Sequence, residues 1–298
     1  WKNMEFLFSV FTPTYNRANT IGRTYEYLCK QTLRSFEWII VDDGSTDNTE
    51  EIVQKWINTN KISIVYLKQE NGGKHRAFNR AVQIAKGEIF ICLDSDDYYI
   101  ETALEIIYSY HLIHKDNPWI AGFSCNSLDL HGNLIGTSLP VDELVVSHYN
   151  LYNSLSVKGD KGLIYYTRIL KEYPFPEFEN EFFVTEALVL NRISLRYKIC
   201  CIKRSLEIKD YQRDGLSSKY RHLCLRNPNG YALYINERNY FNLSFTNYVI
   251  NAASYVRYSL FAGKSFRNIY KEAINRRWTF IIACFLGILL YIKDKSRS

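Results

Sequence analysis

The stretch Ile89-Phe90-Ile91-Cys92-Leu93-Asp94-Ser95-Asp96-Asp97 decides the fold of this chain. A short apolar run ends abruptly in three carboxylates within four positions. An apolar run of this length is typical of a β-strand that is buried on both faces. Carboxylates so close together repel one another unless a positive group lies beside them. The stretch therefore predicts a buried strand with a site for a divalent cation and a phosphorylated ligand at its carboxyl end.

Strand-like and helical patterns alternate through the first hundred residues. The apolar, strand-like runs are residues 6–11, 36–41, 62–67 and 89–93. Helical patterns separate them, and we expect Asn19 to cap the first helix and Gly87 to end the third. Such alternation is typical of a parallel α/β sheet flanked by helices.

Polar clusters lie where carboxyl ends of these strands are expected. They are Pro13-Thr14-Tyr15, Asp42-Asp43, Gly72-Gly73-Lys74 and Asp94 to Asp97. Ligands of parallel α/β sheets bind outside the carboxyl ends of the strands. We therefore expect the four clusters to converge on one edge of the sheet.

The pattern is less regular in the second half of the chain. The further strands that we expect are residues 119–125, 162–169 and 197–208, with a helix over residues 185–196. His131-Gly132-Asn133 is typical of a hairpin turn. Residues 139–159 show no clear pattern.

The composition limits the class of protein. A chain of 298 residues with 47% hydrophobic content can bury a large core. The seven cysteines form no CxxC pair and no zinc-type cluster, which favours a reducing, cytoplasmic compartment. Residues 6–12 are too short for a signal peptide. The net charge of +6 comes largely from the C-terminal part, so we expect no nucleic-acid partner.

The C-terminal part changes character. Residues 265–277 carry apolar side chains at helical spacing with basic residues between them, and residues 278–292 are almost wholly apolar. The apolar run is shorter than the roughly twenty residues of a spanning helix. With Lys293, Lys295 and Arg297 behind it, we expect it to lie on the anionic inner leaflet of the plasma membrane. The alternative is a helix that packs in a homodimer or on the domain itself.

The motifs resemble those of the family 2 glycosyltransferases, inverting enzymes with the GT-A fold. The resemblance covers roughly residues 5 to 100 and weakens after about residue 130. It rests on Phe11-Thr12-Pro13-Thr14-Tyr15-Asn16-Arg17, Val41-Asp42-Asp43-Gly44-Ser45-Thr46-Asp47, Asn71-Gly72-Gly73-Lys74 and Leu93-Asp94-Ser95-Asp96-Asp97. It implies a GT-A domain over residues 1–230, a Rossmann-like, mostly parallel sheet with a nucleotide-binding half (1–100) and an acceptor and sugar half (101–230). Residues 231–298 would form a helical extension.

The resemblance implies roles for the polar clusters. Asp94-Ser95-Asp96 becomes a DxD motif in which Asp96 ligates Mn²⁺ or Mg²⁺ and Asp94 binds the donor. Hard cations prefer such oxygen ligands. The residues placed around the nucleotide-sugar are Pro13, Tyr15, Arg17, Asp42, Asp43, Lys74, Asp94 and Ser95. Tyr15 would lie near the plane of the base, and Asp43 or Asp42 would accept from a base N–H, which suits uracil. Lys74 and Arg76 could face the diphosphate, together with the N–H groups of the glycine turn, or could form a solvated basic start of a helix.

An inverting transfer needs a general base. In the family this is an acid at the start of a helix, in a Glu-Asp pair or its equivalent. Here Thr185-Glu186 matches that place, so the resemblance implies Glu186, with Glu181 and Glu179 of the preceding loop as alternatives. Asp214-Gly215 and the polar stretch to Lys219 could fold over the bound nucleotide, with Asp214 or Arg213 touching the donor or acceptor, or could form an ordinary surface loop.

The function expected is transfer of a sugar from a UDP-sugar to an acceptor hydroxyl, with a saccharide or lipid-linked saccharide as acceptor. Processive synthases of the family carry a QxxRW motif. This chain has Arg277-Trp278, but the Gln position of the motif is occupied by Ile274. One sugar per encounter is therefore expected. The alternatives are a nucleotidyltransferase and a non-catalytic membrane-bound scaffold. The first normally has a glycine-rich loop after its first strand, and residues 12–17 contain no glycine.

Overall fold

The computed structural model describes residues 6–212, 220–274 and 280–296. The chain divides into two compact units. Unit 1 comprises Trp1–Pro174 and Leu190–Arg213, and unit 2 comprises Phe175–Val189 and Asp214–Ser298. The resemblance places residues 175–189 and 214–230 in the acceptor and sugar half (101–230). In the division by contacts, both segments belong to unit 2, together with the C-terminal helices.

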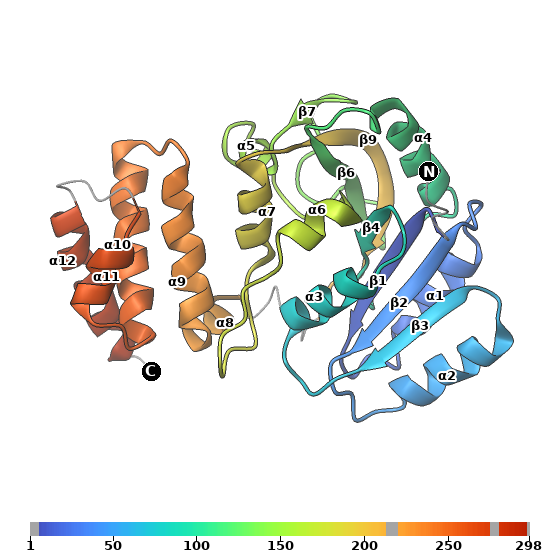
Figure 1. The fold of residues 1–298 in the computed structure, drawn as a ribbon, viewed down its shortest axis with the longest axis horizontal. Coiled ribbons are helices and arrows are strands. Elements are labelled where there is room, and N and C mark those ends of the chain that lie inside the picture. Colours follow the sequence, from blue (N-terminus) through green and yellow to red (C-terminus); the bar gives the residue numbers. More distant parts are fainter. Residues whose placement is uncertain (1–5, 213–219, 275–279, 297–298) are drawn as a thin grey trace. The chain divides into compact units, whose positions relative to one another are not determined.

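Unit 1 is built on a sheet that has nine strands within the described residues and the main order β3-β2-β1-β4-β8-β6-β9-β5 (Figure 1). The first four strands in that order run parallel: β1 (Phe8–Thr14), β2 (Phe36–Asp42), β3 (Ser63–Lys68) and β4 (Ile89–Cys92). β1, β2 and β4 are almost wholly buried, which explains their continuous apolar sequences. The alternating pattern therefore predicted this half correctly.

The second half of the sheet is mixed rather than parallel. β8 (Lys161–Tyr166) pairs antiparallel with β4 and with β6 (Ile120–Asp129), and β9 (Lys198–Lys209) runs parallel to β6. The short strands β5 (Tyr98–Tyr99) and β7 (Val145–Val146) pair antiparallel with β9. Asp129 accepts from the N–H groups of His131 and Asn133, which forms the predicted turn after β6.

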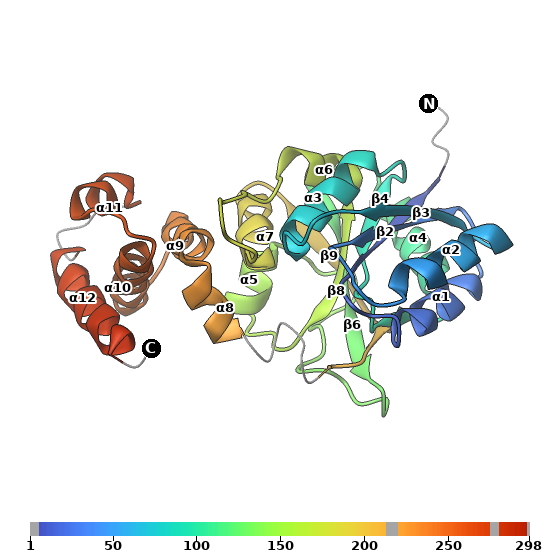
Figure 2. The ribbon, with the colours of Figure 1, turned by 90° about the horizontal axis from the view of Figure 1, so that it is seen from below.

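Helices cover both faces of the sheet. Those of the first part are α1 (Ile21–Cys29), α2 (Thr49–Thr59), α3 (Lys74–Ile84) and α4 (Ala103–His114). They are followed by α5 (His148–Asn153), α6 (Thr167–Glu172) and α7 (Glu186–Ser194). α3 lies on the opposite face from α1 and α2 (Figure 2). Right-handed crossovers require this, because the chain reverses direction across the sheet between β3 and β4.

Two expected helix boundaries differ from the structure. Thr20, not Asn19, precedes α1. α3 ends at Ile84, so Gly87 does not end it. A Cβ atom on Gly87 would lie 2.3 Å from the backbone of Phe8 and Ser9. Glycine stands there because the chain passes close to β1 as it enters β4.

Unit 2 contains a bundle of helices. They are α8 (Tyr220–Arg226), α9 (Pro228–Glu237), the 3₁₀ turn η2 (Arg238–Tyr240), α10 (Phe245–Phe261), α11 (Phe266–Glu272) and α12 (Phe280–Lys295). Gly287 lets α12 approach α10 closely, because a Cβ atom there would lie 2.6 Å from the Ala253 carbonyl oxygen. Asp294 forms ion pairs with Arg257 and Arg221. α12 therefore has one face that packs on α10.

The other face of α12 is apolar and exposed. Its exposed side chains are Ile281, Ile282, Phe285, Leu286, Leu289, Leu290 and Ile292. We call these seven residues the α12 face. Within the described residues, no helix has both the length and the apolar character to cross a membrane. Arg277 and Trp278 lie outside the described residues.

Candidate functional site

The polar clusters meet at the carboxyl edge of the parallel strands, as predicted from their order. Thr14 pairs with Asp42, and the Asp43 N–H donates to the Thr14 carbonyl at 2.9 Å. On the other side of β1, the Leu93 N–H donates to the Phe11 carbonyl at 2.8 Å. The β1 loop that begins at Pro13 is thereby held between the acids that follow β2 and those that follow β4.

Asp43 organises the glycine turn. Its carboxylate accepts hydrogen bonds from the N–H groups of Gly72 and Gly73, both at 2.8 Å, and from the side chain of Gln69. Gly73 has a φ of 91°, which a residue with a Cβ would rarely adopt. The N–H groups of Gly72 and Gly73 therefore bind Asp43 rather than a diphosphate, which corrects the expectation for this turn.

Asp42 holds a different turn. It is fully buried, and its two oxygens accept from the Ser45 N–H and the Tyr66 hydroxyl, both at 2.6 Å. Burial, together with this carboxylate, raises the pKa of Tyr66 far above its ordinary value. Asp42 therefore stabilises the loop after β2 and has no surface on which to meet a ligand.

The β1 loop presents Tyr15. The Tyr15 side chain is 48% exposed, although it lies between tightly held neighbours. Asn16 adopts the left-handed conformation, with a φ of 53°, and its side-chain oxygen accepts from the Thr46 and Asp47 N–H groups. The Asn16 N–H donates to Ser45. The β1 and β2 loops thus fix each other and leave the Tyr15 ring available at the edge of the site.

Asp94 is paired with the start of α3. The Lys74 ammonium lies 2.6 Å from the Asp94 carboxylate. Burial alone would raise the pKa of Asp94, but the charges of Lys74 and Lys209 lower it. Asp94 is therefore held as an anion by the cation at the start of α3.

Asp96 has different surroundings. Burial, reinforced by the nearby charge of Asp94, raises the pKa of Asp96 to about 6. The Asp96 carbonyl accepts from Arg23 at 2.8 Å. The charges of Arg17 and Lys74 act in the opposite direction and favour the ionised form of Asp96. Ser95, between the two acids, is buried.

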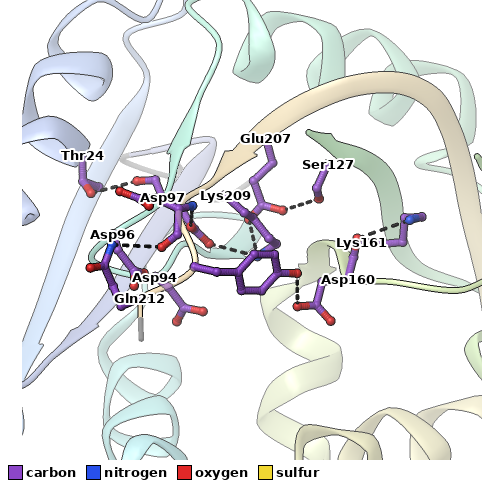
Figure 3. A network of polar contacts seen from close by, with 12 residues as sticks. Thr24, Asp94, Asp96, Asp97, Ser127, Asp160, Lys161, Glu207, Lys209 and Gln212 are labelled. Carbon is purple, nitrogen blue, oxygen red and sulfur yellow. Dashed lines mark hydrogen bonds and ion pairs between the residues drawn. The ribbon is translucent and has the colours of Figure 1, made fainter. Parts of the chain in front are cut away.

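A buried network behind the acids was not predicted from the sequence (Figure 3). Lys209, at the end of β9, forms an ion pair with Asp97. Arg23 of α1 binds both the Asp96 carbonyl and the Asp210 carboxylate. The apolar spacing of α1 predicts a helix but does not show which of its polar residues faces the sheet edge. The pairing of β9 with β5 depends on tertiary structure, so Lys209 gave no sequence signal.

The three candidate bases belong to unit 2. Glu186 is the first residue of α7. Glu181 is buried, and its carboxylate accepts from the Asn229 N–H at 2.6 Å and the Gly230 N–H at 2.9 Å, at the start of α9. Glu179 is exposed. Glu181 therefore caps a helix, which leaves Glu186 and Glu179. Arg213 and Asp214 lie outside the described residues.

Comparisons with known proteins identify the domain. Residues 9–128 match the model of the family described as Glycosyl transferase family 2. The glycosyltransferase GlyG of Streptococcus pneumoniae is 35% identical over 149 residues, which cover 48% of each protein. The chain contains a family 2 glycosyltransferase domain.

The fold of this glycosyltransferase domain and its extension is also found in solved structures. The crystal structure of a fragment of Staphylococcus aureus TarS in complex with UDP-GlcNAc has a TM-score of 0.62 and 20% identity. The structural match covers 97% of this chain and 91% of the TarS fragment. The mannosyltransferase PcManGT from Pyrobaculum calidifontis, in complex with GDP-Man and Mn²⁺, has a TM-score of 0.55 and 16% identity. Both likenesses show the GT-A fold.

The aligned residues span about half or less of the length of these curated relatives. TarS, a poly(ribitol-phosphate) beta-N-acetylglucosaminyltransferase of Staphylococcus aureus, is 32% identical over 200 residues, which are 63% of this chain and 34% of that protein. The aligned part of GlyG is also about half of its length, at 48%.

The side chains after β4 of the glycosyltransferase domain include oxygen ligands that suit a hard divalent metal ion. Asp94 and Asp96 offer carboxylate oxygens, which Mn²⁺ and Mg²⁺ prefer. In the described residues, no group of three or more His, Cys, Asp or Glu side chains converges on a metal position. A metal at Asp96 would therefore need further oxygens, and those of a bound diphosphate are suitable ligands.

Proposed function

We propose that this chain transfers a sugar from a UDP-sugar to an acceptor hydroxyl with inversion at the anomeric carbon. The observation that carries the proposal is the arrangement after β4, where Lys74 forms an ion pair with Asp94 while burial and the charge of Asp94 raise the pKa of the neighbouring Asp96 carboxyl. TarS, which has the same fold, was crystallised with UDP-GlcNAc. This supports UDP as the nucleotide.

In the proposed reaction, the chain's own residues bind and orient the donor. The exposed Tyr15 ring would pack on the base, beside Pro13 and Arg17 of the same loop. Asp43 would accept from the base N–H in addition to the glycine turn, because Asp43 keeps a small exposed surface whereas Asp42 is fully buried. Lys74 would face the diphosphate from the start of α3, with Asp94 and Ser95 beside the donor.

Asp96 would hold Mn²⁺ or Mg²⁺, which when bound stabilises the charge that develops on the departing diphosphate. The acceptor oxygen bonds to the anomeric carbon as the bond from that carbon to UDP breaks. The acceptor proton passes to a carboxylate, and we assign this role to Glu186. Two observations support Glu186: it is the first residue of α7, and the Glu181 carboxylate is already bound to the N–H groups at the start of α9.

We further propose that the α12 face binds the membrane leaflet on which a lipid-linked or growing surface polysaccharide is assembled. Lys293 and Lys295 are exposed beside this face, while the acid between them, Asp294, is paired with arginines inside unit 2. An exposed surface that is apolar and basic favours an anionic lipid interface. A homodimer contact is the competing assignment.

Release of UDP tests the proposal most directly. The protein is incubated with a panel of UDP-sugars and candidate saccharide acceptors, with Mn²⁺, with Mg²⁺ or with a chelator. We expect acceptor-dependent UDP release from one donor, and only with metal. Release of pyrophosphate from a nucleoside triphosphate would instead support a nucleotidyltransferase. Binding of UDP-sugars without turnover by any acceptor would support a scaffold.

A further inference from the structure

A buried lysine lies directly behind the acids that follow β4 (Figure 3). The Lys209 ammonium is 3.0 Å from the Asp97 carboxylate and 3.2 Å from that of Glu207. The side chains are 12%, 6% and 2% exposed, in that order. Lysine is rarely buried to this degree unless it is paired, and here two carboxylates pair with it.

The polar groups of Asp97 form hydrogen bonds and an ion pair that hold the turn after β4 in place. One carboxylate oxygen accepts from Lys209 and the other accepts from the Asp210 N–H at 3.0 Å. The Asp97 carbonyl accepts from the Thr24 hydroxyl at 2.8 Å. The Asp97 N–H donates to the Asp94 carbonyl at 3.0 Å, which closes the turn on which Asp94 and Asp96 stand. Any movement of Asp97 would therefore move this turn.

The network continues away from the acids. The second oxygen of Glu207 accepts from the Ser127 hydroxyl of β6 at 2.7 Å. Lys209 thus connects the acid turn to β9 and β6, two strands of the second half of the sheet. Burial would lower the pKa of Lys209, but Glu207 and Asp97 raise it well above the ordinary value. Without this cation, the two buried carboxylates would face each other uncompensated.

We propose that Lys209 is a positioning residue, which fixes Asp97 and so holds Asp94 and Asp96 in the geometry that binds a metal and a nucleoside diphosphate. The inference rests on the proposed function, because it assigns a task to the turn. It also separates the roles of the three acids: Asp97 anchors the turn, while Asp94 and Asp96 meet the ligand. Lys209 acts through its ion-pair partner Asp97, and its charge also favours the ionised form of Asp94.

The test compares two buried lysines. Lys209→Met removes the cation behind the turn. Lys161→Met is the matched control, since Lys161 is also buried in this sheet but donates to the carbonyls of Ile135, Lys158 and Asp160. Two measurements are made on each protein: binding of UDP in the presence of Mn²⁺ by calorimetry, and hydrogen exchange of the peptide that covers residues 94–97.

For Lys209→Met we expect UDP binding with Mn²⁺ to weaken by about tenfold or more, as is usual when the group that orients a ligand residue is lost. The 94–97 amides should exchange faster. Both properties should be unchanged in Lys161→Met. If Lys209→Met does not fold, Lys209→Met with Glu207→Gln removes one of the two facing carboxylates and should show the same two changes.

Unchanged exchange and unchanged or tighter UDP binding in the Lys209 variants would overturn the proposal. Failure of the proposed function looks different. The parent protein would then bind no UDP with Mn²⁺, while the exchange measurement would still decide whether Lys209 holds the turn.

Discussion

Asp94 and Asp96 lie two positions apart in the sequence but have different electrostatic surroundings. Lys74 keeps Asp94 charged, whereas burial and the charge of Asp94 make Asp96 harder to ionise. A bound divalent cation removes that difficulty, because it stabilises the ionised form. This contrast explains why we assign the metal to Asp96 and the donor to Asp94.

Replacement of Asp96 by Asn should reduce metal-dependent UDP release by about a hundredfold or more, since loss of a ligand costs at least as much as loss of its supporting partners. Asp129→Asn is the control, because Asp129 is the last residue of β6 and holds the turn that follows it, and the change should leave the rate unchanged. Initial rates over a range of Mn²⁺ concentrations measure both. Full activity of the Asp96 variant would remove the central assignment.

Replacement of Glu186 by Gln should lower the turnover number by about 10² to 10⁴, because the amide cannot accept the acceptor proton. Binding of the UDP-sugar, measured by calorimetry, should stay as in the parent. Glu179→Gln is the control. If turnover survives in the Glu186 variant and falls in the Glu179 variant, the base is Glu179.

His148 provides a pH-dependent contribution to stability. Burial lowers its pKa from 6.5 to about 4, and its Nδ1 atom has no hydrogen-bond partner in the structure. The unfolded chain therefore takes up a proton between pH 6.5 and 4 that the folded chain does not. The free energy of unfolding should fall in this window as pH falls, with a slope approaching about 1.4 kcal/mol per pH unit from this residue.

Urea unfolding of His148→Gln at several pH values measures that contribution. The variant should lose less stability than the parent between pH 6.5 and 4, whatever its stability at pH 7. The exposed His131, replaced by Gln, should leave the parent's pH dependence intact. If the free energy of unfolding depends on pH in the same way in the parent and the His148 variant, His148 is not the source of this pH dependence.

At the scale of the elements, glycines mark where strands and helices approach closely. Gly87 passes the backbone of β1 at the entry to β4, whereas Gly22, on α1, has open space around its Cβ position. We expect Gly87→Ala to destabilise unit 1 by about 2 kcal/mol or more, because the overlap is with backbone. Gly22→Ala should be neutral or stabilise by about 0.5 kcal/mol. Urea unfolding midpoints distinguish the two, and equal midpoints would contradict this account.

The strands that could be predicted from the sequence are those that are buried along their whole length. β1, β2 and β4 are buried throughout, so their apolar runs were unambiguous, and the acids after them had to share an edge. The direction of β8 had no such signal, because an antiparallel strand between β4 and β6 has the same buried residues as a parallel one. Likewise, the tasks of Asp43 and Glu181 depend on partners distant in sequence, Gly72 and Gly230, which no local pattern reveals.

At the scale of the whole molecule, the α12 face gathers seven exposed large hydrophobic side chains of unit 2 on one helix. We expect the protein to float with vesicles of phosphatidylcholine and phosphatidylglycerol, and less with phosphatidylcholine alone. Phe285→Asp with Leu289→Asp should abolish flotation, since both side chains are more than 60% exposed. Ile250→Asp, on α10 with 59% exposure, is the control.

Sedimentation velocity without lipid separates this proposal from the dimer. A parent protein that does not float but sediments as a dimer, and becomes a monomer on the Phe285 and Leu289 changes, would assign the α12 face to a second copy. UDP release should be unaffected by these changes when the acceptor is a free saccharide.

The strand pairings also determine how the chain must fold. β1 pairs with β4 between Phe8 and Ile89, and β6 pairs with β9 between Ile120 and Lys198, so the sheet is closed by segments far apart in the sequence. Loops of this length must close before their contacts stabilise anything, which slows folding. We therefore expect the pairing of these distant strands to be the slow step when the unfolded chain refolds. Refolding yields should rise at low temperature and low protein concentration, because the unpaired strands are then less exposed to aggregation.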